Sequence, residues 1–206
     1  NLVTSSVSGG ADADSLIFSA VLKSGSTIAG GAGADSMVFN SSVGGAAISL
    51  DAGADSVSFV TKVSGATMHG GGGAQTVAFT TGSNLATFEG TFGGGSINGG
   101  SGNDSLVFSA DASGTSLSGG AGADSISGSI TVGSSGVSFW GGAGDDTFNF
   151  GTGGLTGSAD GTAYFWNEGG TDSIVLGGAL IAQKRLETTE HRVWLHLLAK
   201  CPGTVR

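Results

Sequence analysis

An aspartate returns about every 20 residues along this chain, each time behind a glycine-rich segment. Residues 30–39 read Gly-Gly-Ala-Gly-Ala-Asp-Ser-Met-Val-Phe, and residues 99–108 and 141–150 follow the same pattern. The equivalent positions, at steps of 21, 20, 20, 29, 20, 22 and 26 residues, are Asp14, Asp35, Asp55, Gln75, Asp104, Asp124, Asp146 and Asp172. Self-similarity at such a period predicts an array of stacked units.

Apolar residues keep a fixed register around each aspartate. The residue two places after it is always apolar: Leu16, Met37, Val57, Val77, Leu106, Ile126, Phe148 and Ile174. The residue four places after it is usually phenylalanine: Phe18, Phe39, Phe59, Phe79, Phe108 and Phe150. The residue seven places before it is again apolar, and a glycine ten places before it, such as Gly25 or Gly94, marks a second corner. Alternation with a period of two predicts short strands with one buried face.

These elements predict an all-β fold, a parallel β-solenoid of about eight turns in residues 1–178. Each turn of about 20 residues would contain two strands and two corners. Because one turn cannot bury its own apolar side chains, stacking would place the residues two after the aspartates in one ladder and the phenylalanines in another, at a spacing of about 4.8 Å.

The tail, residues 179–206, differs abruptly in composition. Its apolar residues Leu186, Val193, Trp194, Leu197 and Leu198 predict a short amphipathic helix that ends before Pro202. The sequence leaves three roles open for this tail: a cap on the open end of the solenoid, an assembly or export segment, or a non-native extension.

Composition and charge exclude several classes of protein. Glycine makes up 42 of 206 residues without the Gly-X-Y period of collagen, and the apolar register argues against a disordered chain. Residues 1–180 hold 14 acidic residues but only Lys23 and Lys62 as basic ones, so we expect no binding to nucleic acid or anionic membranes. No segment is apolar for long enough to span a membrane, and the single cysteine, Cys201, excludes an internal disulfide.

The glycine-rich turn has the chemistry of a calcium site. Calcium takes six to eight oxygen ligands and accepts backbone carbonyls, which glycines allow to converge. One turn supplies too few oxygens, so we expect ions between neighbouring turns. Aspartates stacked about 5 Å apart would repel by roughly 1 kcal/mol per pair even in water, which would couple folding to metal binding. The alternative is a metal-free solenoid with solvated aspartates or aspartates bonded to turn amides.

The motif Gly-Gly-x-Gly-x-Asp-x-apolar-x resembles the nonapeptide of the hemolysin-type calcium-binding (RTX) repeat proteins. The match is good at residues 30–38, 99–107, 119–127 and 141–149, partial at 9–17 and 50–58, and weak at 70–78 and 167–175. The resemblance implies a right-handed parallel β-roll that folds on calcium outside the cell, often after type I secretion. It implies as ligands the carboxylates of Asp14, Asp35, Asp55, Asp104, Asp124 and Asp146 and the carbonyls of Gly31, Gly33, Gly100, Gly102, Gly120, Gly122, Gly142 and Gly144.

The chain departs from this family in one respect. Family rolls usually carry the nonapeptide on both edges with a period of 18, whereas here the period is nearer 20 and the motif occurs once per period. We therefore expect one row of ions on one edge, interrupted around Gln75 into an N-terminal and a C-terminal group.

These observations predict a non-catalytic, extracellular structural protein of the surface-layer, surface-filament or adhesive type, with calcium as its partner. Open solenoid ends also favour self-association into a surface assembly. No nucleophile–base pair or phosphate-binding loop is evident, His69 stands alone, and His191 and His196 have no acidic partner for a zinc helix.

Two alternative functions stay open. The chain starts part-way into a repeat, and it could be the calcium-binding module of an exported RTX enzyme or toxin whose catalytic domain lies elsewhere. A solenoid that binds ice or carbohydrate would need regular outward threonine ladders, which the sequence does not offer. Trp140 and Trp166 should point outward, either as a sugar-stacking or interface pair or as isolated surface aromatics.

Overall fold

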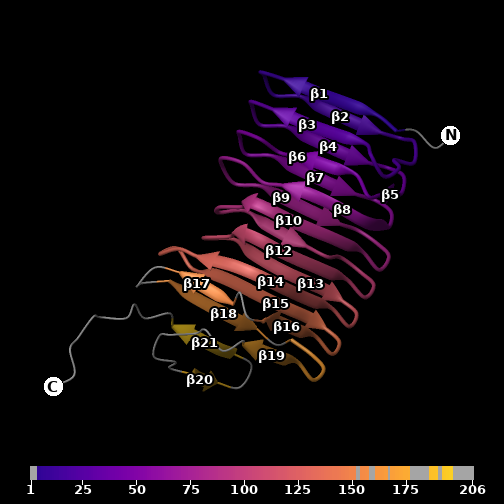
Figure 1. Cartoon of the computed structure of the whole chain (residues 1–206). Helices are drawn as coiled ribbons and strands as arrows, with labels where there is room; N and C mark the ends of the chain where they lie inside the picture. Colours follow the sequence, from indigo (N-terminus) through magenta and orange to yellow (C-terminus); the bar gives the residue numbers. More distant parts are fainter. Residues whose placement is uncertain are drawn as a thin grey trace.

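The computed structural model describes residues 4–151, 154–157, 161–166, 168–176, 186–189 and 192–196. All regular structure in these residues is β-strand. The strands form a β-solenoid of about seven turns of about 20 residues, close to the eight expected, and the chain climbs from β1 to β19 along the stack (Figure 1). The predicted all-β solenoid is therefore confirmed, and its architecture agrees with a right-handed β-roll.

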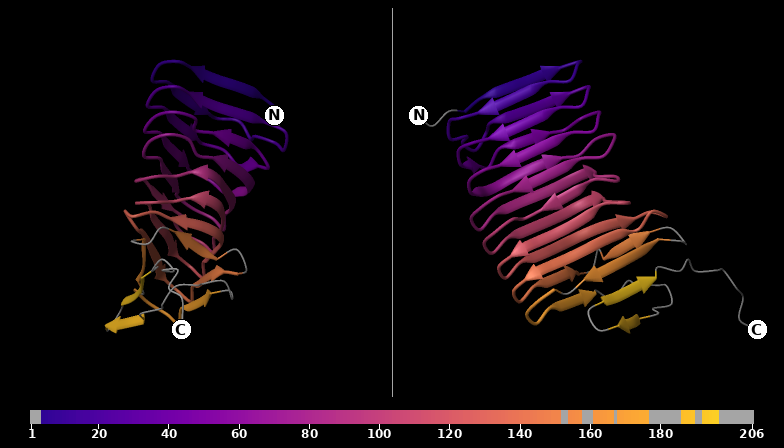
Figure 2. Two further views of the ribbon diagram at one scale, coloured as in Figure 1. Left: turned by 60° about the vertical axis from the view of Figure 1, so that its left-hand side comes forward. Right: turned by 180° about the vertical axis from the view of Figure 1, so that it is seen from behind.

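Two parallel sheets make the long faces of the stack, as the two further views in Figure 2 show. The path of sheet 1 is β1 (Ser6–Gly10), β3 (Thr27–Gly31), β6 (Ala47–Ser49), β8 (Val63–His69), β10 (Leu85–Thr91), β12 (Ser105–Asp111), β14 (Ser125–Val132), β16 (Thr147–Phe150) and β19 (Ser173–Leu176). Two short strands join it, β5 (Val43–Gly44) beside β8 and β17 (Leu155–Gly157) beside β14. Sheet 2 runs β2 (Ser15–Phe18), β4 (Ser36–Phe39), β7 (Ser56–Phe59), β9 (Thr76–Phe79), β11 (Ser96–Asn98), β13 (Ser116–Ala121), β15 (Val137–Ala143) and β18 (Thr162–Trp166), then β21 (Arg192–His196) and β20 (Leu186–Thr189).

The core lies between the sheets and consists of apolar ladders. Phe39 stacks between Phe18 and Phe59 at ring-centroid distances of 4.7 and 4.8 Å, and Phe59 stacks on Phe79 at 4.9 Å. The side chains of Phe39 and Phe59 are fully buried. Stacked rings at the strand spacing add attraction to the burial of their area, which stabilises the register of neighbouring turns.

The ladders do not run as the sequence suggested. The residues two after the aspartates do form one ladder as far as Val77, but Val77 then pairs with Ile97, which belongs to the series seven places before the aspartates. Likewise Phe108 pairs with Phe88 in sheet 1 and not with Phe79 in sheet 2. The single phenylalanine ladder is therefore a wrong prediction, because the repeat changes sheet between residues 79 and 105.

The corners opposite the aspartates are glycine turns, as predicted. The glycines ten places before the aspartates all have positive φ, between 64° and 89°: Gly25, Gly45, Gly65, Gly94, Gly114 and Gly136. A residue with a Cβ is disfavoured at these angles, so the recurring glycine is a requirement of the corner.

The tail forms no helix where the structure describes it. Leu186, Val193 and Trp194 lie in β20 and β21, which pair with each other in antiparallel fashion, while β21 also pairs with β18. Leu197, Leu198 and the boundary at residue 178 lie outside the described residues. The last strand of sheet 2 would otherwise expose unpaired N–H and C=O groups, and satisfying them outweighs a weak helical stripe. The hairpin covers the end of sheet 2, which agrees with a capping role.

Candidate metal centre: two rows of buried aspartates

One set of repeat positions lines the edge where the chain passes from sheet 1 to sheet 2. Asp14, Asp35, Asp55 and Gln75 follow β1, β3, β6 and β8 and precede β2, β4, β7 and β9. We call these four residues the N-terminal row.

A second set lines the opposite edge, where the chain returns from sheet 2 to sheet 1. It consists of Asn84, Asp104, Asp124, Asp146 and Asp172, each of which follows a strand of sheet 2 and precedes one of sheet 1. We call these five residues the C-terminal row. The expectation that only one edge carries the motif is therefore wrong. The reason is that Gln75 and Asn84 are nine residues apart, which is half a turn, whereas Asn84 and Asp104 are a full turn of 20 apart.

One carboxylate oxygen of each buried aspartate is bound to the neighbouring turn. Oδ1 of Asp35 accepts the backbone N–H of Asp14 at 2.8 Å, and Oδ1 of Asp55 accepts that of Asp35 at 2.9 Å. In the C-terminal row the same bond joins Asn84 to Asp104, Asp104 to Asp124, Asp124 to Asp146 and Asp146 to Asp172, at 2.7 to 3.0 Å. This part of the arrangement matches the alternative in which the aspartates bond to turn amides.

The other carboxylate oxygen has no hydrogen-bond partner. Oδ2 is buried and unpaired in Asp35, Asp55, Asp104, Asp124, Asp146 and Asp172. The first five of these residues are only 2 or 3% exposed. Burying an unpaired carboxylate oxygen is expensive, so these atoms call for a proton or a cation.

Glycine carbonyls surround these unpaired oxygens. An ideal Cβ on Gly119 would lie 2.5 Å from Asp124 Oδ2 and 2.7 Å from the carbonyl oxygen of Gly141 in the next turn. The same pairing of an Oδ2 with a carbonyl of the next turn recurs at Gly9 and Gly99. Any larger residue at these positions would push into the carboxylate. The turn that ends at Asp55 is an exception, since buried Leu50 holds this place and Asp51 takes a positive φ of 57°.

The neutral residues of the two rows reveal what the surroundings demand. Asn84 keeps the ladder bond, because its Oδ1 accepts the N–H of Val63 at 2.9 Å. Its Nδ2 donates to the carbonyls of Gly82 at 2.7 Å and Gly99 at 3.3 Å. Gln75 Nε2 similarly donates to the carbonyls of Gly53 and Gly72. An amide supplies N–H donors to these carbonyls, whereas an aspartate presents another acceptor.

Burial also shifts the acidity of the rows. Desolvation raises the pKa of Asp124 from 3.8 to about 6, opposed by the hydrogen bond from the Asp104 amide and reinforced by the charges of Asp104 and Asp146. Desolvation likewise raises the pKa of Asp55, Asp104, Asp146 and Asp172. The ionised rows are therefore under electrostatic stress that a bound cation would relieve.

The donor set fits a hard cation. The described residues contain no cluster of three or more His, Cys, Asp or Glu side chains that could hold a metal, so backbone carbonyls must complete any site. Oxygen-only surroundings with one carboxylate per turn suit calcium, which accepts such carbonyls. Asp35, Asp55, Asp104, Asp124 and Asp146 are equivalent candidates, and Asp14 begins the N-terminal row.

The structure revises the predicted glycine ligands. The carbonyls of Gly31 and Gly100 already accept the N–H groups of Ala52 and Ala121, and Gly120 and Gly142 face each other in the strand register. Gly33, Gly102, Gly122 and Gly144 have positive φ and are equivalent to Gly82, whose carbonyl binds Asn84. Sequence reasoning missed the carbonyls of Gly30, Gly119 and Gly141, which border an Oδ2 of the preceding turn.

It also missed two row members. Asp172 stood in the repeat but was not chosen as a ligand, and Asn84 was overlooked because it carries no charge. The segment around Asn84 nevertheless repeats the pattern, with positive-φ Gly82 two places before it and Phe88 four places after it.

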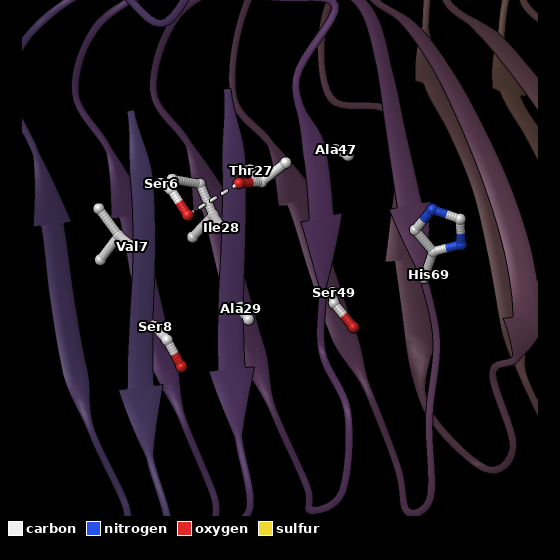
Figure 3. Close-up of a pocket in the computed structure, with 9 residues that line it drawn as sticks. All are labelled: Ser6, Val7, Ser8, Thr27, Ile28, Ala29, Ala47, Ser49 and His69. Carbon is white, nitrogen blue, oxygen red and sulfur yellow. Dashed lines mark hydrogen bonds between the residues drawn. The ribbon is translucent and has the colours of Figure 1, made fainter. Parts of the chain in front are cut away.

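Other candidate features do not form a catalytic site. A shallow groove of about 260 Å³ crosses β1, β3, β6 and β8, and small residues line most of it, with His69 at one end (Figure 3). Thr27 donates to Ser6 there at 3.1 Å, and His69 Nδ1 lies 3.4 Å from a carboxylate oxygen of Glu89. Trp140 and Trp166 stack at 4.5 Å on sheet 2 and are half-buried, so they are a pair rather than isolated aromatics.

Comparison with protein-family models, with curated proteins and with solved structures gave no significant match. In the part of the chain that the structure describes, no helix is long and apolar enough to cross a membrane. The functional argument therefore rests on the residues of this chain.

Proposed function

We propose that this chain is a non-catalytic, extracellular structural protein whose two aspartate rows bind calcium between stacked turns. The observation that carries the proposal is the set of six buried Oδ2 atoms without a hydrogen-bond partner, in surroundings of carbonyl oxygens. Two lysines in residues 1–180 are too few to neutralise them. Low calcium inside a cell would leave the rows unstable, and millimolar calcium outside would complete the fold.

The competing reading is a metal-free solenoid in which protons neutralise the rows. A protonated Oδ2 can donate to a glycine carbonyl, much as Nδ2 of Asn84 does. A calcium titration separates the two readings. Circular dichroism from chelator to 10 mM calcium at pH 7.5 should show a gain of β-structure with calcium and a smaller one with magnesium. The proposal fails if the chain is fully folded in chelator at this pH and calcium adds no thermal stability.

The second candidate function is the calcium-binding module of an exported enzyme or toxin. It shares the metal chemistry and differs in what adjoins the solenoid. Adjoining segments with more repeats would favour the structural protein, and a catalytic motif would favour the enzyme. Self-association through the N-terminal end also follows from the fold, because Val7, Leu16 and Phe18 are only partly buried there. Analytical ultracentrifugation in calcium and in chelator measures it.

A further inference from the structure

The repeat slips by half a turn between Gln75 and Asn84, and we call residues 72–84 the switch segment. Both residues that bound the slip are neutral amides, whereas every other member of the two rows is an aspartate. We propose that the switch segment and the strands around it fold without a cation and separate the chain into two calcium-dependent arms. This inference rests on the proposed calcium function and describes how that function is organised.

Hydrogen bonds support the first part of the proposal. Gln75 Nε2 donates to two glycine carbonyls, and Asn84 Nδ2 donates to two glycine carbonyls and to Asp104 Oδ1 at 2.9 Å. These are the contacts that an aspartate cannot make without a proton or a cation. The corners at Gln75 and Asn84 are thus closed by the chain itself.

Charge supports it as well. Between Asp55 and Asp104 the only acidic residue is Glu89, which is exposed and pairs with His69. Residues 56–103 therefore contain no buried carboxylate, although they span more than two turns. Like-charge repulsion begins only outside them, with Asp55 on one edge and Asp104 on the other.

The core of this central region is rich in aromatic side chains. Phe59 stacks on Phe79, and Phe88 packs edge-on against Phe92 at 5.4 Å. Phe59, Phe88 and Phe92 are fully buried. Apolar burial of this size needs no metal, so strands β8 to β11 have a source of stability that the arms lack.

Hydrogen exchange followed by mass spectrometry tests the proposal. In chelator at pH 7.5, peptides from residues 63–98 should exchange at least about tenfold more slowly than peptides from β1 to β4 and from β13 to β16. In 10 mM calcium all of these peptides should be protected. The variant Asn84→Asp should lose the central protection in chelator and recover it in calcium, because it replaces the donating amide by a carboxylate.

Asn103→Asp is the matched control. Asn103 is exposed beside Asp104, and its Oδ1 accepts the N–H of Ala123, just as Asp145 accepts that of Thr171 at the equivalent corner. It adds the same charge to the same edge and should leave exchange unchanged. If calcium protects the chain but the centre exchanges as fast as the arms in chelator, the inference is wrong and the calcium function stands. If everything is protected in chelator, the calcium function itself is wrong.

Discussion

Replacing Asp124 by asparagine should stabilise the chain in chelator and destabilise it in calcium. Asp124 sits between two charged neighbours in the C-terminal row, with Oδ1 bound to the amide of Asp104 and Oδ2 unpaired. In Asp124→Asn the ladder bond is kept, since asparagine retains Oδ1. The new Nδ2 takes the place that Nδ2 of Asn84 occupies, where it donates to glycine carbonyls.

The size of the effect follows from the acidity of Asp124. A pKa raised from 3.8 to about 6 means that the ionised carboxylate destabilises the cation-free fold by up to about 3 kcal/mol at neutral pH. Removing the charge should recover most of this, which corresponds to roughly 5–10 °C in Tm for a chain of this size. With calcium at 100 times its Kd, loss of one site should instead remove up to about 2.7 kcal/mol.

Thermal unfolding followed by circular dichroism, in chelator and in 10 mM calcium at pH 7.5, measures both signs. Asp145→Asn is the control, because it removes the same charge from an exposed neighbour on the same edge. It should change the free energy of unfolding by less than about 0.5 kcal/mol in either condition. A loss of stability in chelator would refute the idea that the carboxylate is stressed there. A gain in both conditions would mean that calcium does not bind at Asp124.

Three further outcomes are expected. In chelator, urea unfolding should show stability greatest near pH 4 and lost as pH rises towards 6, because the raised pKa of Asp124 lets the folded chain hold its proton more tightly than the unfolded one; a flat profile contradicts this. Gly119→Ala should cost about 1–3 kcal/mol in urea unfolding through contact with Asp124, whereas Gly72→Ala, with open space around it, should be nearly neutral, and equal effects would argue against the glycine requirement. Phe59→Ala should cost about 3–5 kcal/mol by opening the stack, while Val60→Ala at an exposed site should cost little; a small loss for Phe59 would show that the ladder is not a main source of stability.

The sequence was sufficient to predict the solenoid because its signals are local and repeated. Period-two alternation around each aspartate, as at Met37 and Phe39, requires a strand with one buried face, and the glycines at the second corner require positive φ. Stacking is then the only way to bury the apolar residues. The burial of Asp35, Asp55, Asp104, Asp124 and Asp146 could not be predicted in the same way, since it depends on which backbone amides the neighbouring turn brings close.

The two-edge arrangement was present in the sequence but hidden by the choice of marker. A register counted on carboxylates passes over Asn84, so that the step of 29 residues looks like a long loop. Counted on Gly82 and Phe88 as well, the same step divides into nine and 20. The tail failed for another reason: the pairing of β21 with β18 depends on an open sheet end, which no local pattern in residues 186–196 describes.

The half-turn slip is tolerated because the two halves of the repeat are equivalent within the sheets. Before the slip, sheet 2 takes the residues just after each aspartate; after it, sheet 2 takes those eight places before. Both series carry hydroxyls, so one outward ladder runs unbroken across the slip through Ser15, Ser36, Ser56, Thr76, Ser96, Ser116 and Ser138. Inward, Val77 meets Ile97 in the same way. The two half-turns differ only in their corners, and it is the corners that carry the charge. A slip of nine residues therefore leaves the sheets intact, moves the acidic corner to the other edge, and ends each row at the slip with an amide that needs no counter-ion.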